Sequence, residues 1–166
     1  MVTHSFGEHL SPYFDHDLNA EVVQIVIGEY AITSRADQVL VTTLGSCVAA
    51  CARDPVAGIG GMNHFLLPES VEGAVTSRYG RTAMDELITA LVEAGCRRER
   101  LEFKVFGAAR TVSGHLDIGL LNADFILSYL KREGLTLVGR DLGGAFARQV
   151  FYYPLTGRVR CRVLRT

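Results

Sequence analysis

The segment spanning residues 47–67 restricts the fold more than any other part of the chain. Two apolar runs, residues 47–52 and 60–67, flank the turn signal Asp-Pro-Val-Ala-Gly at residues 54–58. Asp at the first turn position, Pro at the second and Gly at a left-handed exit are typical of a type I turn. Two apolar runs joined by such a turn predict a β-hairpin, so part of the protein must be an antiparallel sheet.

The rest of the chain alternates between short β-branched runs and two segments with helical periodicity. Apolar residues recur at helical spacing in residues 79–93 and again in residues 122–132, where Asn122 is a suitable N-cap and Gly134 a suitable stop. Strands are predicted at residues 22–27, 39–43, 101–106, 135–138, 148–153 and 158–164. A doubly wound parallel sheet would need more helix between its strands. We therefore expect a single-domain α+β sandwich, with a mostly antiparallel or mixed sheet and two main helices.

The N-terminal residues differ from the remainder. Residues 1–20 are polar and show no clear periodicity, so we expect a flexible arm. Residues 21–166 contain neither a repeat nor a low-complexity linker, and they are enough to bury a core of their own. We expect them to form one domain.

Composition narrows the classes of function. The chain has 17 Lys and Arg against 18 Asp and Glu, a net charge of -1, and so lacks the basic excess of a nucleic-acid-binding protein. Its apolar stretches are too short to span a bilayer. The first residues lack the basic start and apolar run of a secretory signal. We expect a cytoplasmic protein that neither binds nucleic acid nor inserts into a membrane.

The four cysteines do not have the spacing of a metal site. Cys47 and Cys51 form a CxxxC pair with no second pair and no nearby HxxxH, so a zinc site is not indicated. Cys51, Cys96 and Cys161 have no histidine near them in the sequence and read as packing residues. We expect neither a metal nor a cofactor.

Cys47 and His64 lie on the two arms of the predicted hairpin. A tight turn centred between Pro55 and Val56 places Cys47 directly opposite His64. A longer turn, which spans residues 55–58, places Cys47 opposite Leu66. His64 is then the diagonal neighbour of Cys47 on the same face. Both turns therefore bring thiol and imidazole together, whereas a slip of one residue would put them on opposite faces.

A thiol beside an imidazole is suited to nucleophilic attack on an amide. A free cysteine titrates near pH ~8.5, so an imidazole that accepts its proton generates the attacking thiolate. The imidazolium can then protonate the leaving amine, and backbone N–H groups of the turn at residues 44–47 can stabilise the oxyanion. Thr42, Thr43 and Asn63 are nearby polar residues that could orient His64. The alternative is that Cys47 is inert packing, the usual role of a free cysteine.

The stretch TTLGSCVAACARDPVAGIGGMNHFLLP, residues 42–68, resembles the CheD family, the chemoreceptor glutamine deamidases of bacterial chemotaxis. The similarity extends over most of the chain, through residues 28–30, 79–80, 106–109, 141–144 and 156–157. The resemblance implies hydrolysis of glutamine side-chain amides on chemoreceptor cytoplasmic helices to glutamate and ammonia, and in some members action on methyl esters there. It also implies a CheC-type phosphatase as a partner in some bacteria.

The resemblance carries the family's nucleophile onto Cys47 and its histidine onto His64. The family's third catalytic residue is a threonine six positions before the cysteine, where this chain has Val41. In a regular strand Thr43 shares the face of Val41 and Cys47, whereas Thr42 points the other way unless the strand bulges. We therefore predict Cys47, His64 and Thr43 as the catalytic residues.

Two other functions compete with the deamidase hypothesis. A non-catalytic adaptor that binds receptors or a CheC-type phosphatase would explain the departure at Val41. A cysteine peptidase would use the same pair of side chains, but it needs a long cleft and releases a new N-terminus. The deamidase is the reading that accounts for both the hairpin geometry and the motif.

Overall fold

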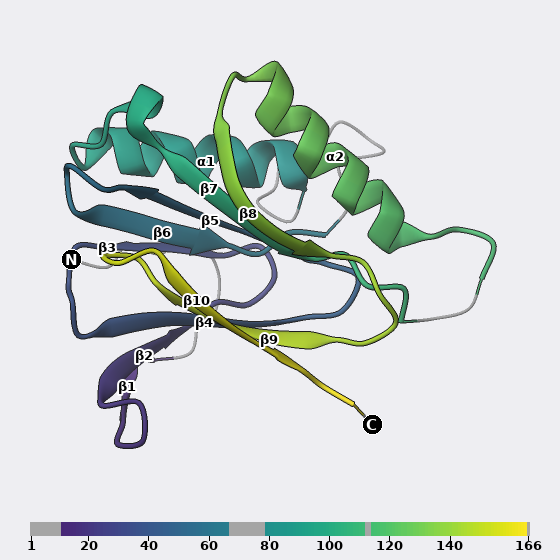
Figure 1. Cartoon of the computed structure of the whole chain (residues 1–166), viewed down its shortest axis with the longest axis horizontal. Helices are drawn as coiled ribbons and strands as arrows, with labels where there is room; N and C mark the ends of the chain where they lie inside the picture. Colours follow the sequence, from purple (N-terminus) through teal and green to yellow (C-terminus); the bar gives the residue numbers. More distant parts are fainter. Residues whose placement is uncertain (1–10, 67–78, 112–113, 166) are drawn as a thin grey trace.

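The structure, a computed structural model, describes residues 11–66, 79–111 and 114–165. Two helices and ten strands are found in this part of the chain, and Figure 1 shows their arrangement. The helices are α1 (Gly80–Glu93) and α2 (Ile118–Arg132), and η1 (Arg98–Arg100) is one 3₁₀ turn. The strands are β1 (Tyr13–Asp15), β2 (Ala20–Gln24), β3 (Tyr30–Thr33), β4 (Gln38–Leu44), β5 (Val48–Asp54), β6 (Ile59–Asn63), β7 (Glu102–Gly107), β8 (Thr136–Leu142), β9 (Arg148–Tyr153) and β10 (Arg158–Val163).

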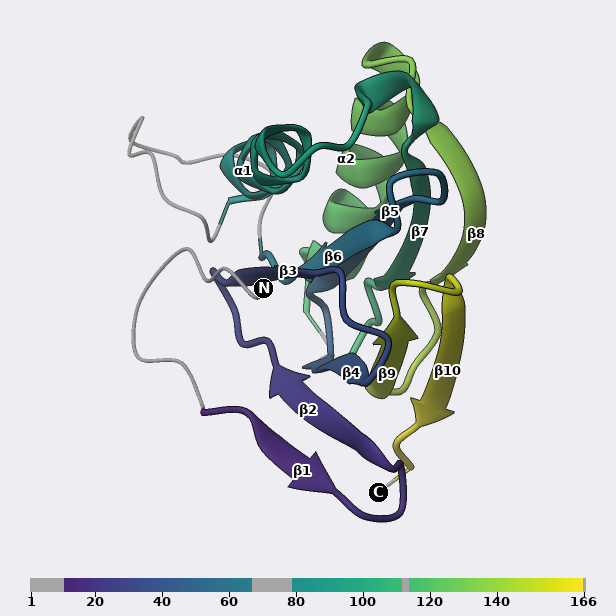
Figure 2. The same cartoon turned by 90° about the vertical axis from the view of Figure 1, so that its left-hand side faces the viewer.

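The strands form two five-stranded sheets. Sheet A has the order β1-β2-β4-β9-β10, and sheet B has the order β3-β6-β5-β7-β8. Each sheet is mixed, because β2 pairs with β4 and β7 pairs with β8 in parallel while the other neighbours are antiparallel. Figure 2 shows the layers in order: helices, sheet B and sheet A. The predicted α+β sandwich with two main helices is confirmed, with its strands divided between two sheets.

Sheet B is covered on both faces, and its central strand shows this in its sequence. One face of β5 contributes Val48, Ala50 and Ala52 to the core beneath the helices. The opposite face contributes Ala49 and Cys51 to the core between the sheets. Burial on both faces explains why this strand is a continuous apolar run rather than an alternating one.

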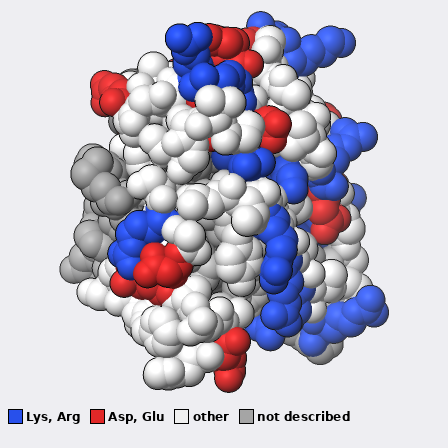
Figure 3. All heavy atoms as spheres, turned by 60° about the vertical axis from the view of Figure 1, so that its left-hand side comes forward, with Lys and Arg blue, Asp and Glu red and all other residues white. Residues whose placement is uncertain are grey.

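The outer face of sheet A carries no helix (Figure 2). Its apolar centre includes Val39 and Val41 of β4, and its far edge is basic. Arg158, Arg160 and Arg162 alternate along β10 and are exposed. Figure 3 shows Lys and Arg side chains gathered in a stripe on one side of the molecule.

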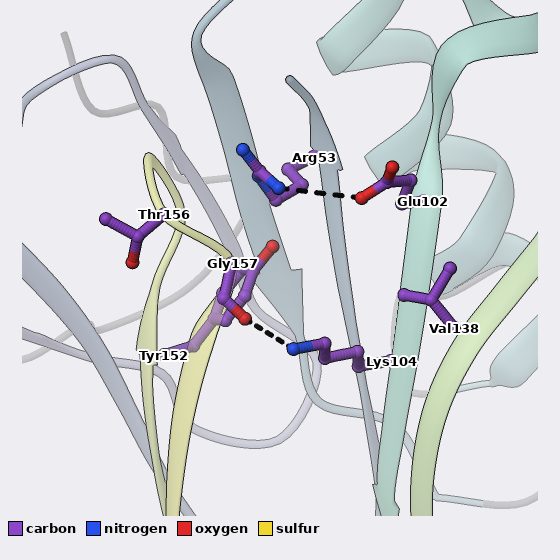
Figure 4. Close-up of a pocket in the computed structure, with 7 residues that line it drawn as sticks. All are labelled: Arg53, Glu102, Lys104, Val138, Tyr152, Thr156 and Gly157. Atoms are coloured by element: carbon purple, nitrogen blue, oxygen red, sulfur yellow. Dashed lines mark hydrogen bonds and ion pairs between the residues drawn. The ribbon is translucent and has the colours of Figure 1, made fainter.

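The two sheets are fastened together at one edge by cations of sheet B. Arg53 donates to the carbonyl oxygens of Pro154 and Leu155, both at 3.1 Å, and Lys104 donates to that of Gly157 at 2.6 Å. Figure 4 shows this region, where a pocket of about 270 Å³ separates the strands. Because both cations are engaged by carbonyls of the β9–β10 turn, we assign them a structural role.

The start of α1 was predicted correctly from the sequence to within one residue, whereas the start of α2 was not. The segment predicted at residues 79–93 is α1, and its predicted apolar stripe is buried except for Val92, which is exposed. The second helix begins earlier than predicted: its N-cap is Asp117, whose side chain accepts a hydrogen bond from Leu120 N–H. The assignment of Asn122 as N-cap was therefore wrong. Asn122 is buried inside α2 and its side chain is used elsewhere. Neither helix in the described ranges has the length and apolar character needed to cross a membrane.

Half of the predicted N-terminal arm, residues 11–20, lies within the described residues. Residues 1–10 lie outside the described residues. Within the remainder of the arm, β1 pairs antiparallel with β2 through Tyr13 and Val22, and so forms the edge of sheet A. Strands β1 and β3 were not predicted from the sequence, because they are only three and four residues long.

Candidate active site

The predicted hairpin is β5–β6, and its register is that of the longer turn. Cys51 pairs with Met62, Asp54 pairs with Ile59, and a bridge between Val48 and Phe65 continues the same register past the end of β6. Gly58 occupies the left-handed exit with a φ of 69°. Cys47 and His64 are therefore diagonal neighbours at the open end of the hairpin, as the longer turn requires.

Both side chains face sheet A. Val48, which follows Cys47, packs under the helices, so Cys47 itself packs against the core between the sheets. Asn63, which precedes His64, points to α1, where its Nδ2 donates to Ala83 O at 3.3 Å. The alternation of the strands thus turns the next residue, His64, toward β4.

Cys47 lies in the segment that crosses from sheet A to sheet B, between β4 and β5. It is partly exposed, whereas Cys51 is fully buried in the middle of β5. Burial raises the pKa of the Cys47 thiol, and its own backbone N–H opposes that effect. The resting form at neutral pH is therefore the thiol.

The segment after β7 holds in place residues 45–47, which we name the nucleophile loop after the candidate nucleophile Cys47. Ala108 N–H donates to Cys47 O at 2.7 Å, and Ala109 N–H donates to Gly45 O at 2.9 Å. Gly107 has a φ of 112° and Ala108 a φ of 58°, a left-handed conformation that is unfavourable for alanine. A Cβ at Gly107 would collide with the Cys47 carbonyl. The positive φ and the close approach to the Cys47 carbonyl explain why residue 107 is a glycine.

His64 is held by its backbone and by its ring. Its N–H donates to Glu29 O at 3.2 Å, and its carbonyl accepts from Gly28 N–H at 2.8 Å. The ring is 7% exposed, and its Nδ1 lies 2.8 Å from Thr42 Oγ1. Thr42 Oγ1 is also 2.6 Å from Ile25 O.

These hydrogen bonds determine the tautomer of the imidazole. Thr42 has one hydroxyl proton, and Ile25 O can only accept it. Thr42 Oγ1 must then accept from Nδ1–H, which leaves the lone pair on Nε2. Burial lowers the pKa of His64 to about 4, although the Ile25 carbonyl opposes this shift. The ring is therefore a neutral base at neutral pH.

The threonine in hydrogen-bond contact with the His64 ring is Thr42 and not Thr43. β4 is regular through Leu44, so Thr42 points inward and Thr43 points outward beside Gln149 of β9. Cys47 lies beyond the end of the strand, across the Gly45-Ser46 turn, so strand alternation does not relate it to Thr43. Thr43 is exposed, and with His64 it lines a surface pocket of about 260 Å³. The third candidate, Asn63, accepts from Ala50 N–H at 2.9 Å and has a packing role.

No group of three or more His, Cys, Asp and Glu side chains close enough to hold a metal ion is found among residues 11–66, 79–111 and 114–165. The open end of the hairpin presents a thiol, a neutral imidazole and backbone N–H groups. A thiol and a base on one face, with the base oriented by a hydrogen-bonded third group, are the parts of a cysteine-dependent hydrolase.

Comparison with known proteins gives the family. A family model described as CheD chemotactic sensory transduction matches residues 66–163. Relatives named "Probable chemoreceptor glutamine deamidase CheD" include one from Rhizobium etli, 50% identical over 145 residues, which covers 85% of this chain and 79% of the relative. A second relative, from Bordetella parapertussis, is 48% identical over 155 residues. The alignment covers 90% of this chain and 73% of the relative. A third relative, from Halorhodospira halophila, is 43% identical over 171 residues. The alignment covers 97% of this chain and 78% of the relative. This chain belongs to the CheD family.

Likeness to solved structures is lower. The Bacillus licheniformis hypothetical protein YfiH aligns with 45% of this chain and 25% of its own, at 17% identity and a TM-score of 0.34. That score is too low to support any conclusion about this chain.

Proposed function

We propose that this protein is a cysteine-dependent glutamine deamidase that converts glutamine side chains on chemoreceptor cytoplasmic helices to glutamate, with release of ammonia. The single observation that carries the proposal is the pairing of a partly exposed Cys47 with a buried, neutral His64 on one face of the hairpin. The names of the relatives supply the substrate class.

The reaction begins with a neutral pair. Nε2 of His64 accepts the Cys47 proton as Sγ attacks the amide carbon, because the thiolate and the imidazolium are each disfavoured by burial until they form together. The C=O bond opens to an oxyanion, which backbone N–H groups of the nucleophile loop can stabilise. The His64 imidazolium then protonates the amide nitrogen, the C–N bond breaks, and ammonia leaves behind a thioester on Cys47.

Water completes the cycle. Nε2 of His64 removes a proton from water as its oxygen attacks the thioester carbon, and collapse of the second oxyanion breaks the C–S bond. Glutamate leaves, and the proton held by His64 returns to the Cys47 sulfur. Thr42 keeps Nδ1 protonated throughout, so that Nε2 remains the base; we propose it as the orienting residue in place of Thr43.

Three further expectations belong to this proposal. The same thiolate can attack a methyl ester and release methanol, so receptor methylesterase activity is a second reaction of the site. A receptor's cytoplasmic helices are reached from the cytoplasm, where we expect the protein to act without inserting into the membrane. A CheC-type phosphatase is a candidate regulatory partner.

The test is an incubation of a purified receptor cytoplasmic fragment with the protein. We expect the mass of the fragment to increase, for each modified glutamine, by the difference between an amide and a carboxylic acid. One molecule of ammonia should be released for each modified glutamine. Cys47→Ala should release none, whereas Cys161→Ala, which removes the other partly exposed thiol, should match wild type. A wild-type protein that binds the fragment but leaves its mass unchanged would support the adaptor and refute the deamidase.

A further inference from the structure

Asn122 is a fully buried asparagine that the catalytic scheme does not use. It lies inside α2, and its side chain leaves the helix to donate from Nδ2 to the carbonyl of Ser46 at 2.8 Å. Ser46 is the residue immediately before the nucleophile. Building on the deamidase function proposed above, we propose that Asn122 is a positioning residue that turns the backbone N–H of Cys47 toward the substrate, where it completes an oxyanion-binding site together with the backbone N–H of Ser46.

The direction of these N–H groups follows from the planarity of the peptide bond. In a trans peptide the C=O of one residue and the N–H of the next point in opposite directions, and the described residues contain no cis peptide. Every carbonyl of the nucleophile loop is bound by the segment from Ala108 to α2. The bonds are Ala109 N–H to Gly45 O at 2.9 Å, Asn122 Nδ2 to Ser46 O at 2.8 Å and Ala108 N–H to Cys47 O at 2.7 Å.

Two N–H groups are consequently free to face the other way. Val48 N–H is already bound to Phe65 O at 3.0 Å. Within the described part of the chain, Ser46 N–H and Cys47 N–H donate to no backbone acceptor.

The Ser46 carbonyl is the one that needs a side chain. The N–H groups of Ala108 and Ala109 serve its neighbours, and the N–H groups inside α2 are used within the helix. Gly119 allows α2 to come close, since a Cβ there would collide with the carbonyl oxygens of Ala108 and Ala109. Asn122 then spans the remaining gap.

The burial of Asn122 has a cost in stability that points to function. Its Oδ1 is buried and has no partner within the described residues. A leucine of similar volume would remove this unpaired oxygen, although it would also take the donor away from the Ser46 carbonyl. The Nδ2 bond explains why an amide is nevertheless present, because preorganised donors stabilise an oxyanion only if they do not have to reorient during the reaction.

The test compares Asn122→Leu with Tyr129→Phe. The control removes another buried hydrogen bond of α2, the 2.6 Å bond from Tyr129 to Asp85, and leaves Ser46 untouched. Three quantities are measured: kcat, KM for the receptor fragment, and the rate at which iodoacetamide alkylates Cys47. Alkylation consumes the thiolate but forms no oxyanion. It therefore distinguishes an effect of Asn122 on the reactivity of the thiol from an effect on stabilisation of the oxyanion. We expect Asn122→Leu to lose about 10²-fold in kcat with KM and alkylation little changed, and Tyr129→Phe to keep all three.

Other outcomes overturn the inference. If wild type releases ammonia and Asn122→Leu has the same kcat, Asn122 positions nothing. If kcat and alkylation fall by the same factor, Asn122 acts on the thiol rather than on the oxyanion. A wild type that releases no ammonia overturns the proposed function instead, and the inference with it.

A measurement on the wild type removes any dependence on how the variant folds. A short peptide carrying an aldehyde in place of the glutamine amide adds the Cys47 sulfur to its carbonyl carbon, and the thiol proton passes to the oxygen. We expect the amide proton resonances of Ser46 and Cys47 to move downfield when this hemithioacetal forms. Resonances that do not move would refute the assignment of these two donors.

Discussion

The two ends of β5 treat charge in opposite ways. At the closed end of the hairpin, Asp54 is fully buried and accepts from the N–H groups of Val56, Ala57 and Arg97 and from Arg100, at 2.9 to 3.0 Å. Burial alone would raise the pKa of Asp54, but these hydrogen bonds lower it to about 2. At the open end, burial raises the pKa of the Cys47 thiol and lowers that of His64 to about 4.

The difference shows how one short element can serve both stability and reactivity. A buried carboxylate that receives several N–H donors is fixed in its charged form and stabilises the turn. For the Cys47 thiol and the His64 imidazole, burial outweighs the hydrogen bonds that favour the charged forms, so both groups rest in their neutral forms. The thiolate–imidazolium pair is unfavourable at rest and forms only when the sulfur attacks a substrate carbonyl. The groups at the open end therefore serve the reaction rather than the stability of the fold.

The largest expected effect is at the open end. His64→Ala should lower kcat by about 10³-fold, because general base catalysis by a positioned side chain contributes that much. The loss should shrink as the pH is raised, since the thiol then ionises without help. Ammonia release from the receptor fragment between neutral and alkaline pH is the measurement. A loss that stays constant over this range would mean that His64 does not deprotonate Cys47.

At the closed end the expected effect is on stability and not on catalysis. Asp54→Asn removes a charged acceptor and should lower the free energy of unfolding by about 2 to 3 kcal/mol. Urea denaturation measures the loss, and kcat of the folded variant should equal that of wild type. If kcat fell while stability was retained, the separation of roles between the two ends of β5 would be wrong.

Thr42 and Thr43 offer a matched pair within one strand. Thr42→Val removes the acceptor for His64 Nδ1–H. We expect kcat to fall by about tenfold or more, because the base is then no longer held in the correct orientation. Thr43→Val makes the same chemical change on the outer face of sheet A and should leave kcat close to wild type. The reverse result would return the orienting role to Thr43.

The pattern of these residues also shows how far the sequence could predict the site. Cys47 and His64 could be placed on one face because a hairpin's register is a local property, set by the turn between residues 54 and 58. Thr42 could not be chosen over Thr43, because the alternation that relates strand residues stops at Leu44. The turn at Gly45-Ser46 then redirects the chain between two sheets.

The fold shows the same limit. Helix α1 was predicted within one residue at its start, since its apolar stripe is a local pattern. The division of the strands into two sheets depends on pairings such as β4 with β9, which join residues far apart in the sequence. Asn122 was assigned to the wrong role for a related reason. Its residue type suits an N-cap, and only the position of Ser46 in space gives its side chain a different partner.

The smallest expected effect distinguishes the two ends of β5 by pH. His64 has a folded pKa of about 4, below its ordinary value of 6.5, so the unfolded chain binds more protons between those pH values. Its contribution to stability is complete above pH 6.5 and is lost as the pH falls toward 4. Asp54 behaves in the same direction at lower pH, because its folded pKa of about 2 lies below the ordinary 3.8 and its contribution disappears between those values.

Urea denaturation across this range separates the two groups. Between pH 6.5 and 4, His64→Ala should reduce the slope of unfolding free energy against pH by up to about 1 kcal/mol per pH unit relative to wild type. Asp54→Asn should leave that slope unchanged and flatten the curve only below pH 3.8. If His64→Ala retained the wild-type slope, the imidazole would not be held neutral by the fold. The imidazole would then titrate in the folded protein as it does in the unfolded chain, and the effect of burial on charge that distinguishes the open end of β5 from the closed end would be absent.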